Sequence, residues 1–331
     1  MKNCIIGVDG GNTKTDYFLF DLDGNYIDNL RDGQCCQHII GFEKAEEIIF
    51  ARIKQLLVKN GLDMGNVCAG GFGLAGIDNR YQRERFVEIF TRMGIPRFEV
   101  DNDGYLGIIA GTTRGSGICS INGTGTVTAG IDILGRRLQV GGMGQITGDD
   151  AGGEYIAQWG VRMVYDSVFR CGEKTAMTEP IFQFLEINEP TDLLCTIVEK
   201  TPKLNDTELT RIVFKAAALG DGPALEILDN CGKQLAKSSA GCVRNLDFNK
   251  DIEIVLAGSV WAKAEDPALF NSYKKYMGNL LPEKRATYNI LRIPPATGAV
   301  LWALSLCGSD CLTDIIRNKV VNAVESIFIN T

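Results

Sequence analysis

Short apolar runs separated by polar turns open the chain, and apolar residues at helical spacing follow them. Runs of this length bounded by glycine and aspartate are typical of strands, whereas apolar positions three and four residues apart are typical of helices. On this basis the expected strands are 4–8, 15–20, 25–28, 67–71 and 98–100, and the expected helices are 43–59 and 80–93. The order is therefore three strands, helix, strand, helix and strand.

The same order begins again near residue 117. The expected strands there are 117–121, 126–133, 137–140, 251–258 and 289–293, and the expected helices are 152–169, 190–200, 205–219, 222–244, 267–279, 296–307 and 312–327. A repeated order of elements indicates an internally duplicated α/β protein. The length of 331 residues agrees with two domains, because a single core rarely extends beyond about 250–300 residues.

The first turn of each repeat combines glycine with threonine. Residues 8–15, VDGGNTKT, align with residues 121–128, INGTGTVT, and each segment joins the first two strands of its repeat. Glycine lets the backbone approach an anion, and turn N–H groups and threonine hydroxyls donate hydrogen bonds to it. Two such turns facing each other across a cleft would suit a polyphosphate. The alternative is two ordinary hairpins in one large sheet.

A competing glycine motif lies at 71–76. The sequence GFGLAG has the spacing of a dinucleotide-binding loop and lies between an expected strand and an expected helix. However, it follows the fourth strand rather than the first, and no acidic residue about 20 positions on suits a ribose. A Walker A sequence does not occur in the chain. We therefore favour the two Gly-Thr turns as the nucleotide-binding segments.

Charge, hydropathy and cysteine content limit the partners and the location that the protein can have. The net charge is −7 without a Lys/Arg run, which argues against nucleic acid, and no apolar run approaches the roughly 18 residues of a membrane span. Met1-Lys2-Asn3 leads straight into the first strand, so we expect a cytoplasmic protein without a signal peptide. The 11 cysteines contain no C-x-x-C pair and are expected to be reduced, and His38 is the only histidine.

Seven segments carry a family resemblance along nearly the whole chain. They are GVDGGNTKTD (7–16), DGQCCQHIIG (32–41), NDG (102–104), INGTGT (121–126), GGMGQITGDDAGGEYIA (141–157), LAGSVW (256–261) and PPATGAVLWAL (294–304). Each is weak alone, but together and in this order they resemble the N-acetylglucosamine kinase branch of the BadF/BadG/BcrA/BcrD ATPases. That branch belongs to the acetate kinase/sugar kinase/hsp70/actin superfamily.

The resemblance implies an α/β, duplicated ribonuclease H-like (actin-like ATPase) fold with two domains around a nucleotide cleft. The first domain would comprise residues 1–115 and the C-terminal helix at about 312–331. The second would comprise 116–311 and include a helical insert. The resemblance also implies ATP and Mg²⁺ as cofactors, an amino sugar as the substrate and a homodimer as the assembly.

The resemblance further implies roles for individual residues. Asp9 would hold Mg²⁺, and Asp103 would be the base that takes a proton from a sugar hydroxyl. The ATP contacts would be Gly10, Gly11, Asn12, Thr13, Lys14, Gly123, Thr124, Gly125, Gly258 and Ser259; the sugar contacts would be Gln37, Gly76, Asp103, Thr124, Gly142, Met143 and Asp149. Phosphoryl transfer needs mainly positioning and charge neutralisation, so the lack of a catalytic histidine is no obstacle.

Two of these assignments have an alternative. Asp149, together with Asp150, could cap the helix that follows instead of binding sugar. Asp101 lies two residues from Asp103 and is the other candidate base, although the family register favours Asp103.

The sequence departs from the family pattern at residues that the resemblance places near the sugar. Gln37 stands where animal N-acetylglucosamine kinases have asparagine, Met143 and Gln145 where they have tryptophan and histidine, and Asn122 where they have serine. Phosphoryl transfer from ATP is therefore better supported than the identity of the sugar. N-acetylglucosamine, phosphorylated to its 6-phosphate, is the first expectation, ahead of glucosamine and N-acetylmuramic acid.

Three other functions have partial support. An ATPase that activates a dehydratase or reductase would need cysteines for an iron-sulfur cluster, and Cys35-Cys36 and Cys171 do not match that spacing. A type III pantothenate kinase, suggested by GNT at 11–13, would be shorter and without the long helical insert at 152–250. A sugar-sensing repressor would carry a helix-turn-helix before the first strand and a zinc-binding cysteine motif.

Overall fold

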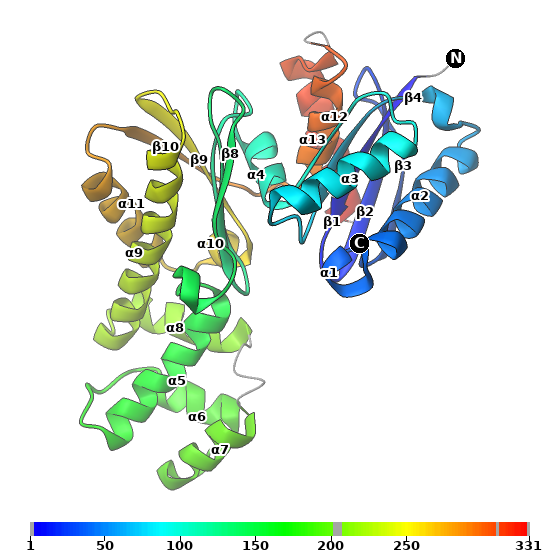
Figure 1. Ribbon diagram of the computed structural model, residues 1–331. Coiled ribbons are helices and arrows are strands. Elements are labelled where there is room, and N and C mark those ends of the chain that lie inside the picture. The colour runs from blue at the N-terminus through cyan, green and yellow to red at the C-terminus, as the bar shows by residue number, and fades with distance from the viewer. Residues whose placement is uncertain (1–2, 201–206, 309–310, 330–331) are drawn as a thin grey trace. The chain divides into compact units, whose positions relative to one another are not determined.

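The chain forms two units, each built on a five-stranded mixed sheet (Figure 1). The structure is a computed structural model that describes residues 3–200, 207–308 and 311–329. The first unit comprises Met1–Ser116 and Leu291–Thr331, and the second comprises Gly117–Ile290. Among the described residues, no helix is both long and apolar enough to cross a membrane.

The first sheet has the strand order β3-β2-β1-β4-β5. Its strands are β1 (Cys4–Gly10), β2 (Lys14–Asp21), β3 (Tyr26–Gly33), β4 (Val67–Leu74) and β5 (Phe98–Asp101). The first three strands are antiparallel neighbours, whereas β1, β4 and β5 run parallel. The carboxyl ends of β1, β4 and β5 therefore meet at one edge of the sheet, which is where open α/β sheets bind ligands.

Helices cover both faces of the first sheet (Figure 1). Side chains of α2 (Phe42–Lys59) and α3 (Arg80–Arg92) pack on one face, and those of α12 (Ala296–Ser305) and α13 (Asp314–Ile329) pack on the other. The remaining elements are α1 (Gln37–Ile40), the 3₁₀ turn η1 (Met64–Asn66) and α4 (Gly104–Gly111). Because each strand of the sheet centre is covered on both sides, its residues are almost continuously apolar.

The second sheet repeats this arrangement with the order β10-β9-β6-β7-β8. Its strands are β6 (Gly117–Asn122), β7 (Thr126–Ile131), β8 (Arg137–Gly141), β9 (Asp251–Ala257) and β10 (Arg285–Ile290). The strands β6, β7 and β8 are antiparallel neighbours, and β6, β9 and β10 run parallel. The two sheets have the same topology, so the predicted duplicated ribonuclease H-like fold is confirmed. The two Gly-Thr hairpins lie in separate sheets, and the alternative of one large sheet is wrong.

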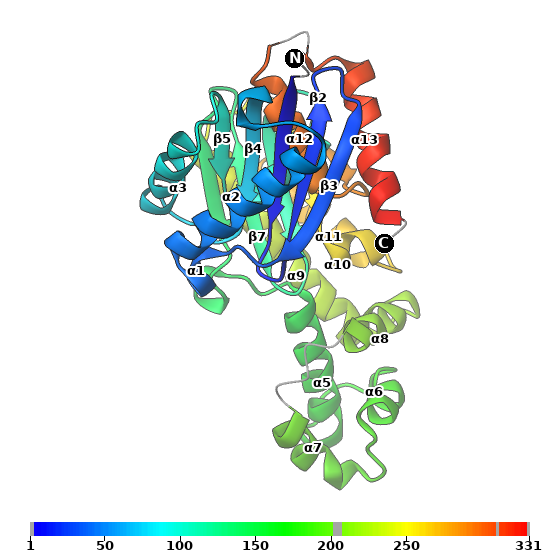
Figure 2. The ribbon, with the colours of Figure 1, turned by 90° about the vertical axis from the view of Figure 1, so that its right-hand side faces the viewer.

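The helices of the second unit form two groups. The long helix α9 (Gly222–Asn245) packs on β7 and β8, and α11 (Ala268–Leu280) packs on α9. The other group, which lies at one end of the sheet in Figure 2, consists of α5 (Gly153–Phe169), α6 (Thr178–Leu185), α7 (Leu193–Lys200) and α8 (Thr207–Ala218). Shorter elements are α10 (Ser259–Lys263) and the 3₁₀ turns η2 (Gln145–Thr147) and η3 (Pro190–Asp192).

Several boundaries differ from the sequence prediction. The last strand is Arg285–Ile290 rather than 289–293, and the helix expected at 190–200 begins as a 3₁₀ turn. The helix expected at 205–219 begins at Thr207 in the described residues, and residues 205 and 206 lie outside them. Three short helices, α1, α6 and α10, were not predicted. They span four to eight residues, which is too short for a helical period to show in the sequence.

The chain returns to the first unit at Leu291, earlier than the expected residue 312. The reason is that α12 packs directly on β1 and β4. Glycines permit this close approach: a Cβ atom at Gly71 would lie 2.2 Å from the carbonyl oxygen of Ala299, and one at Gly7 would lie 2.8 Å from Val300. A Cβ atom at Gly73 would likewise lie 2.4 Å from Leu106. The G-x-G-x-x-G motif at 71–76 is therefore explained by packing in this fold.

Candidate active site

The first Gly-Thr hairpin joins β1 to β2 at the ligand-binding edge of the first sheet. Its turn, residues 10–14, is closed by a hydrogen bond from the Gly11 N–H to the Lys14 carbonyl of 2.9 Å. A Cβ atom at Gly10 would lie 2.6 Å from the Cys35 sulfur, so a larger residue cannot pack there. The side chains of Asn12, Thr13 and Lys14 are exposed and can reach a ligand.

Asp9 and Asp103 lie at the carboxyl ends of β1 and β5, on either side of β4 in the sheet order. Burial raises the pKa of Asp9 to about 7, and the negative charges of Asp103 and Asp16 add to the shift while Lys14 opposes it. Burial also raises the pKa of Asp103 to about 6, although the backbone N–H groups of Gly104 and of Asp103 itself favour the charged form. Two carboxyl groups with raised pKa values at one sheet edge are typical of a functional site.

The residues present fit a magnesium site of the kind that phosphotransfer enzymes use. Mg²⁺ usually keeps several waters and takes one or two protein carboxylates together with phosphate oxygens. Asp9 offers such a carboxylate beside the glycine turn. Burial is the main cause of its raised pKa, and the negative charges of Asp103 and Asp16, which a cation would offset, add to it. Within the described ranges there is no group of three or more His, Cys, Asp or Glu side chains that would hold a metal without phosphate.

Asp101 and Asp103 differ in their surroundings. The carboxylate of Asp101 is paired with the Arg83 guanidinium (Nε–Oδ2 3.3 Å) and also accepts from the Asn102 N–H. Asp103 precedes α4, but its side chain does not form the capping hydrogen bond of this helix, and the Gly104 N–H lies 2.9 Å from Asn102 Oδ1, to which it donates. Asp101 therefore has a structural partner, whereas Asp103 has the properties expected of a base.

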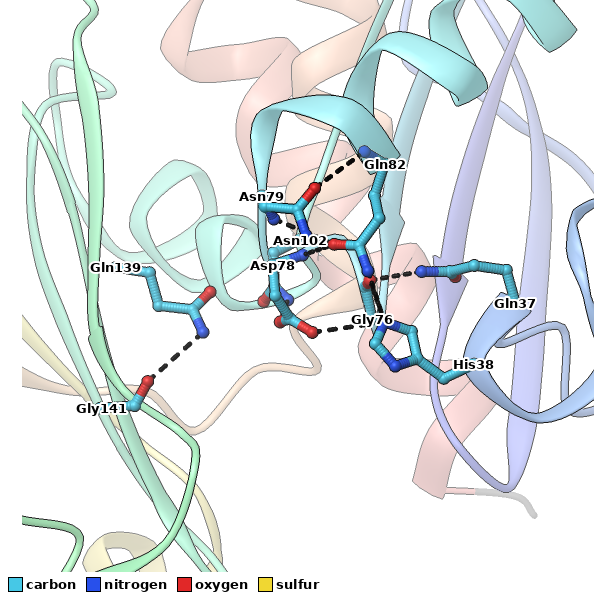
Figure 3. Close-up of polar contacts among 9 residues, drawn as sticks. All are labelled: Gln37, His38, Gly76, Asp78, Asn79, Gln82, Asn102, Gln139 and Gly141. Atoms are coloured by element: carbon cyan, nitrogen blue, oxygen red, sulfur yellow. Dashed lines mark hydrogen bonds and ion pairs between the residues drawn. The ribbon is translucent and has the colours of Figure 1, made fainter. Parts of the chain in front are cut away.

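A polar cluster around Gly76 lies in the first unit (Figure 3) and includes Asn102, the residue before Asp103. The carbonyl oxygen of Gly76 accepts from the Gln37 side-chain amide and contacts His38 Nε2 at 2.8 Å. Asp78 lies 3.5 Å from His38 Nε2 and accepts from the Asn102 amide at 3.3 Å. Gly76 has φ +87°, and a Cβ atom there would lie 2.7 Å from His38. The cluster thus brings the predicted sugar contacts Gln37 and Gly76 together.

Gln37 has an unused acceptor. Its amide nitrogen is committed to Gly76, whereas its Oε1 is buried and without a hydrogen-bond partner in the described structure. A buried acceptor without a donor is costly, and a ligand hydroxyl or N–H could satisfy it. This observation fits a polyhydroxylated substrate beside the cluster.

Several residues of the cluster were missed at the level of sequence. Asp78, Gln82 and Asn102 connect the predicted site residues, and Gln82 contacts both the Asp78 N–H (2.8 Å) and His38 Nε2 (2.7 Å). A signal was available for one of them, because Asn79 and Gln82 have capping-box spacing and form that box at the start of α3. No sequence pattern points to Asp78.

The second Gly-Thr hairpin joins β6 to β7 and rests on the start of α5. The carbonyl oxygens of Gly123 and Thr124 accept from the N–H groups of Gly153 (2.8 Å) and Glu154 (3.0 Å). A Cβ atom at Gly152 would lie 2.3 Å from the Thr124 oxygen, and Gly258 (φ +102°) approaches Asn122 equally closely, at 2.4 Å. The turn, the start of α5 and the β9–α10 connection are therefore held against one another.

Two hollows of the second unit share Thr124 and Glu154. One has a volume of about 270 Å³ and is lined by residues that include Gly123, Thr210, Phe214, Ser259, Val260 and Lys263. The other has a volume of about 300 Å³ and is lined by residues that include Gly125, Gly142, Gly144, Asp149, Tyr155 and Gln158. The first hollow combines an apolar wall with a lysine beside the Gly-Thr turn, which suits an aromatic base that carries phosphates.

Asp149 organises the loop that precedes α5. Its Oδ2 accepts hydrogen bonds from the N–H groups of Gly142 (2.8 Å) and Gly144 (2.6 Å) and from the Thr147 hydroxyl (3.0 Å). It does not cap α5, whose N-cap is Gly152 without a side-chain hydrogen bond, so the capping alternative for Asp149 and Asp150 is wrong. Met143 is 62% exposed and is not among the residues that line the hollow. The predicted sugar contacts of Asp149 and Met143 stay predictions.

The Gly258→Ala substitution tests how tightly the second hairpin is held. An alanine would take a positive φ that it disfavours and would bring Cβ against Asn122, so we expect a loss of roughly 1–3 kcal/mol in unfolding free energy. The matched control is Gly278→Ala in α11, where a Cβ atom meets nothing within 4 Å and alanine favours the helix. Thermal unfolding of both variants measures the difference. A Gly258→Ala variant as stable as Gly278→Ala would contradict the expectation.

The sequence model of the BadF/BadG/BcrA/BcrD ATPase family matches residues 6–303. The chain belongs to this family. Membership of an ATPase family implies ATP as its nucleotide.

Two curated relatives of this chain are kinases by name. One is the N-acetylmuramic acid/N-acetylglucosamine kinase of Clostridium acetobutylicum, 27% identical over 92% of this chain and 99% of the relative. The other is the N-acetyl-D-glucosamine kinase of Dictyostelium discoideum, 24% identical over 92% and 98% of the two chains. Both alignments cover nearly the full length of each protein.

Solved structures support the fold. A candidate N-acetylglucosamine kinase of Chromobacterium violaceum superposes with a TM-score of 0.61 at 21% identity, over 91% of this chain and 99% of that one. A ROK family glucokinase of Streptomyces griseus, solved with glucose and AMPPNP, superposes with a TM-score of 0.53 at 17% identity, over 92% and 99%. These superpositions show that the chain has the duplicated ribonuclease H-like (actin-like) fold.

Proposed function

We propose that this protein is an ATP-dependent sugar kinase that phosphorylates a hydroxyl group of an amino sugar, with N-acetylglucosamine and its 6-phosphate as the first candidates. The proposal rests mainly on the environment of the Asp103 carboxyl group. It has a raised pKa, lies at the sheet edge beside Asp9, and adjoins the polar Gly76 cluster. Two relatives with kinase names, aligned over nearly their full length, support the same reaction class.

Asp103 is the general base in this proposal. Its carboxylate takes the proton of the sugar hydroxyl as the hydroxyl oxygen forms a bond to the γ-phosphorus of ATP and the bond to the bridging oxygen breaks. A pKa of about 6 keeps Asp103 deprotonated at neutral pH while making it a better base than an exposed aspartate. Gln37, with its buried unpaired Oε1, orients the sugar by accepting from one of its hydroxyl or N–H groups.

The glycine turns hold the phosphates. In the first unit, backbone N–H groups of residues 10–13, the Thr13 hydroxyl and the Lys14 ammonium are the donors, and in the second unit Thr124 with Gly123 and Gly125 has the same role. Asp9 holds Mg²⁺, which neutralises charge on the phosphate oxygens when it is bound. Ser259 and the hollow beside it receive the adenosine.

Electrostatics favours a neutral sugar over an acidic one. The carboxyl groups of Asp78 and Asp103 both lie at the Gly76 cluster, where Asp78 is 3.5 Å from His38 Nε2. A carboxylate on the substrate would meet these negative charges. We therefore rank N-acetylglucosamine and glucosamine above N-acetylmuramic acid, which carries a lactyl carboxylate.

A coupled ATPase assay over a panel of sugars tests the proposal. We expect ADP formation to depend on added sugar and to have the highest kcat/KM with N-acetylglucosamine, followed by glucosamine, with N-acetylmuramic acid at least about tenfold lower because of the like charges. Glucose and mannose serve as controls for general hexokinase activity, and mass spectrometry of the product locates the phosphate.

The panel also separates the competing function. Hydrolysis of ATP at one rate with or without every sugar would contradict the kinase proposal and favour an activator-type ATPase. Against that function, Cys35 and Cys36 are 1% and 2% exposed, and burial raises the pKa of Cys35 to about 11, which does not suit a solvent-facing cluster ligand.

A further inference from the structure

A row of charged residues crosses the first three strands of the sheet beside the first hairpin turn. The strand register places Asp9 opposite Asp16, and Asp16 opposite Arg31, so the three side chains lie on one face of the sheet. Arg31 makes two contacts to the Asp16 carboxylate, from Nε at 2.6 Å and from Nη2 at 3.3 Å. Asp16 is only 4% exposed, and the Arg31 guanidinium supplies the short contacts to its carboxylate.

Lys14 shares this carboxylate but is held more loosely. Its ammonium lies 3.8 Å from Asp16 Oδ2, and its side chain is 53% exposed. Arg31 already provides the short contacts to Asp16, so Lys14 can leave the carboxylate without stranding a buried charge. The ammonium is thus kept near the turn at 10–14 while remaining able to move toward an anion there.

The last turn of α13 completes the surroundings of Lys14. The Phe328 ring stacks on Phe18 of β2 with a centroid distance of 6.2 Å. The Arg31 guanidinium carbon lies 5.0 Å from the Phe328 ring centroid and the Lys14 ammonium 5.5 Å from it. Both distances are within the range of cation–π attraction. An aromatic side chain from the C-terminal end of the sequence therefore contacts the two cations next to a turn at its N-terminal end.

We propose that Phe328, acting with Asp16, is a positioning residue that orients Lys14 for the outer phosphates of ATP. Lysine has a flexible stem with many rotamers, and ordering it only when the nucleotide binds would weaken binding. The Phe328 ring and the Asp16 carboxylate restrict Lys14 beforehand, so part of that entropy is lost already in the free protein. The inference rests on the proposed function, because it assumes that Lys14 meets a phosphate group.

Kinetics of Phe328→Leu test the inference. Leucine keeps an apolar contact with Phe18 and removes the ring face, so we expect the KM for ATP to rise about threefold to tenfold, as for the loss of one or two cation–π contacts, with kcat and the KM for sugar changed less than about twofold. Phe328→Tyr keeps the ring face and should restore the wild-type KM. The matched control is Phe270→Leu in α11, which removes the contact of Lys274 with an aromatic ring at 4.3 Å and should leave the KM for ATP unchanged.

A double-mutant cycle separates positioning from simple anchoring of α13. If Phe328 acts through Lys14, then Phe328→Leu should add little to the KM of Lys14→Met. Additive effects of the two substitutions, or a Phe328→Leu variant with an unchanged or lower KM for ATP, would overturn the inference. A lower melting temperature with normal kinetics would also overturn it, since that result indicates anchoring only.

Binding of Mg-AMPPNP to the wild type shows whether a negative result counts against the positioning role of Phe328 or against the proposed kinase function. If the wild type binds the analogue by calorimetry and turns over sugar, unchanged kinetics of Phe328→Leu count against the inference alone. If the wild type neither binds the analogue nor uses ATP, the proposed function fails and the positioning role of Phe328 fails with it.

Discussion

Replacing Asp103 with asparagine should lower kcat by about 10²-fold or more while leaving the affinities for sugar and ATP within a fewfold. Asparagine has the same shape and can still hydrogen-bond a hydroxyl, but it cannot accept the proton as the oxygen attacks phosphorus. General bases contribute about 10²–10⁴-fold, and the lower end is expected here because the proton moves late in a loose transition state. Single-turnover rates and equilibrium binding on the same sample measure the two effects separately.

The pH profile gives the same prediction an independent measurement. Since the Asp103 pKa is raised to about 6, kcat/KM of the wild type should fall as the pH drops below about 6, where the base becomes protonated. The acid limb that belongs to Asp103 should be absent from the residual activity of Asp103→Asn. Asp101→Asn is the matched control: its carboxylate is paired with Arg83, so the substitution should affect stability more than turnover. An inactive Asp101→Asn beside an active Asp103→Asn would move the base by two residues.

Stability distinguishes the base from a helix cap. A carboxyl group whose pKa is higher in the folded than in the unfolded state binds more protons when folded. Its contribution to stability is therefore complete below the unfolded value of about 4 and is lost as the pH rises through about 6. Asparagine carries no charge at pH 7.5, so Asp103→Asn avoids the destabilisation that the buried, charged carboxylate causes in the wild type. The melting temperature of the variant at pH 7.5 should therefore equal or exceed that of the wild type. Removal of a cap would lower it instead.

Replacing Asp9 with asparagine should abolish most turnover by weakening the metal site. The substitution keeps the shape of the side chain and removes its charge, and charge stabilisation by a bound metal is worth several kcal/mol, so we expect a loss of at least about 10²-fold in kcat/KM. Excess Mg²⁺ or Mn²⁺ should restore part of the activity. Titration of ADP binding with and without Mg²⁺ should show that the metal-dependent part of the affinity is lost.

The protonation of Asp9 gives a second readout of the metal role. Its pKa of about 7 in the free protein means that protons compete with Mg²⁺, so the Mg²⁺ concentration needed for half-maximal activity should rise as the pH falls below about 7. The control is Asp23→Asn, an exposed acid in the turn between β2 and β3, which should behave as the wild type. Full activity of Asp9→Asn at ordinary Mg²⁺ concentrations would remove Asp9 from the metal site.

Local sequence patterns were sufficient for the duplicated architecture and for both glycine turns. The runs at 4–8 and 15–20, and again at 117–121 and 126–133, are strands whose apolar residues are buried on both faces, so their pattern is strong over a short window. Motif order along the chain indicated the ATPase family, and the family model that matches residues 6–303 confirms it.

Tertiary contacts decided what local patterns left open. The glycines at 71 and 73 have the spacing of a dinucleotide loop, yet they admit α12 and Leu106 against the sheet, and only the packed structure distinguishes these uses. The helix α4 is buried on nearly all sides and has no amphipathic period, so the apolar pattern does not reveal its extent. The last strand is shifted to Arg285–Ile290 because pairing with β9, rather than its own apolar run, sets its position.

The candidate site shows the same division. Asp9, Asp103 and the residues of the two turns were predicted from the family resemblance, and the structure places each of them within a few residues of a strand end. Their roles stay predictions. Asp78, Gln82 and the pairing of Asp101 with Arg83 were not, because these contacts join segments that are distant or unpatterned in sequence. Phe328 is the extreme case: it lies more than 300 residues from Lys14, and only the packing of α13 on β2 brings its ring beside the first hairpin.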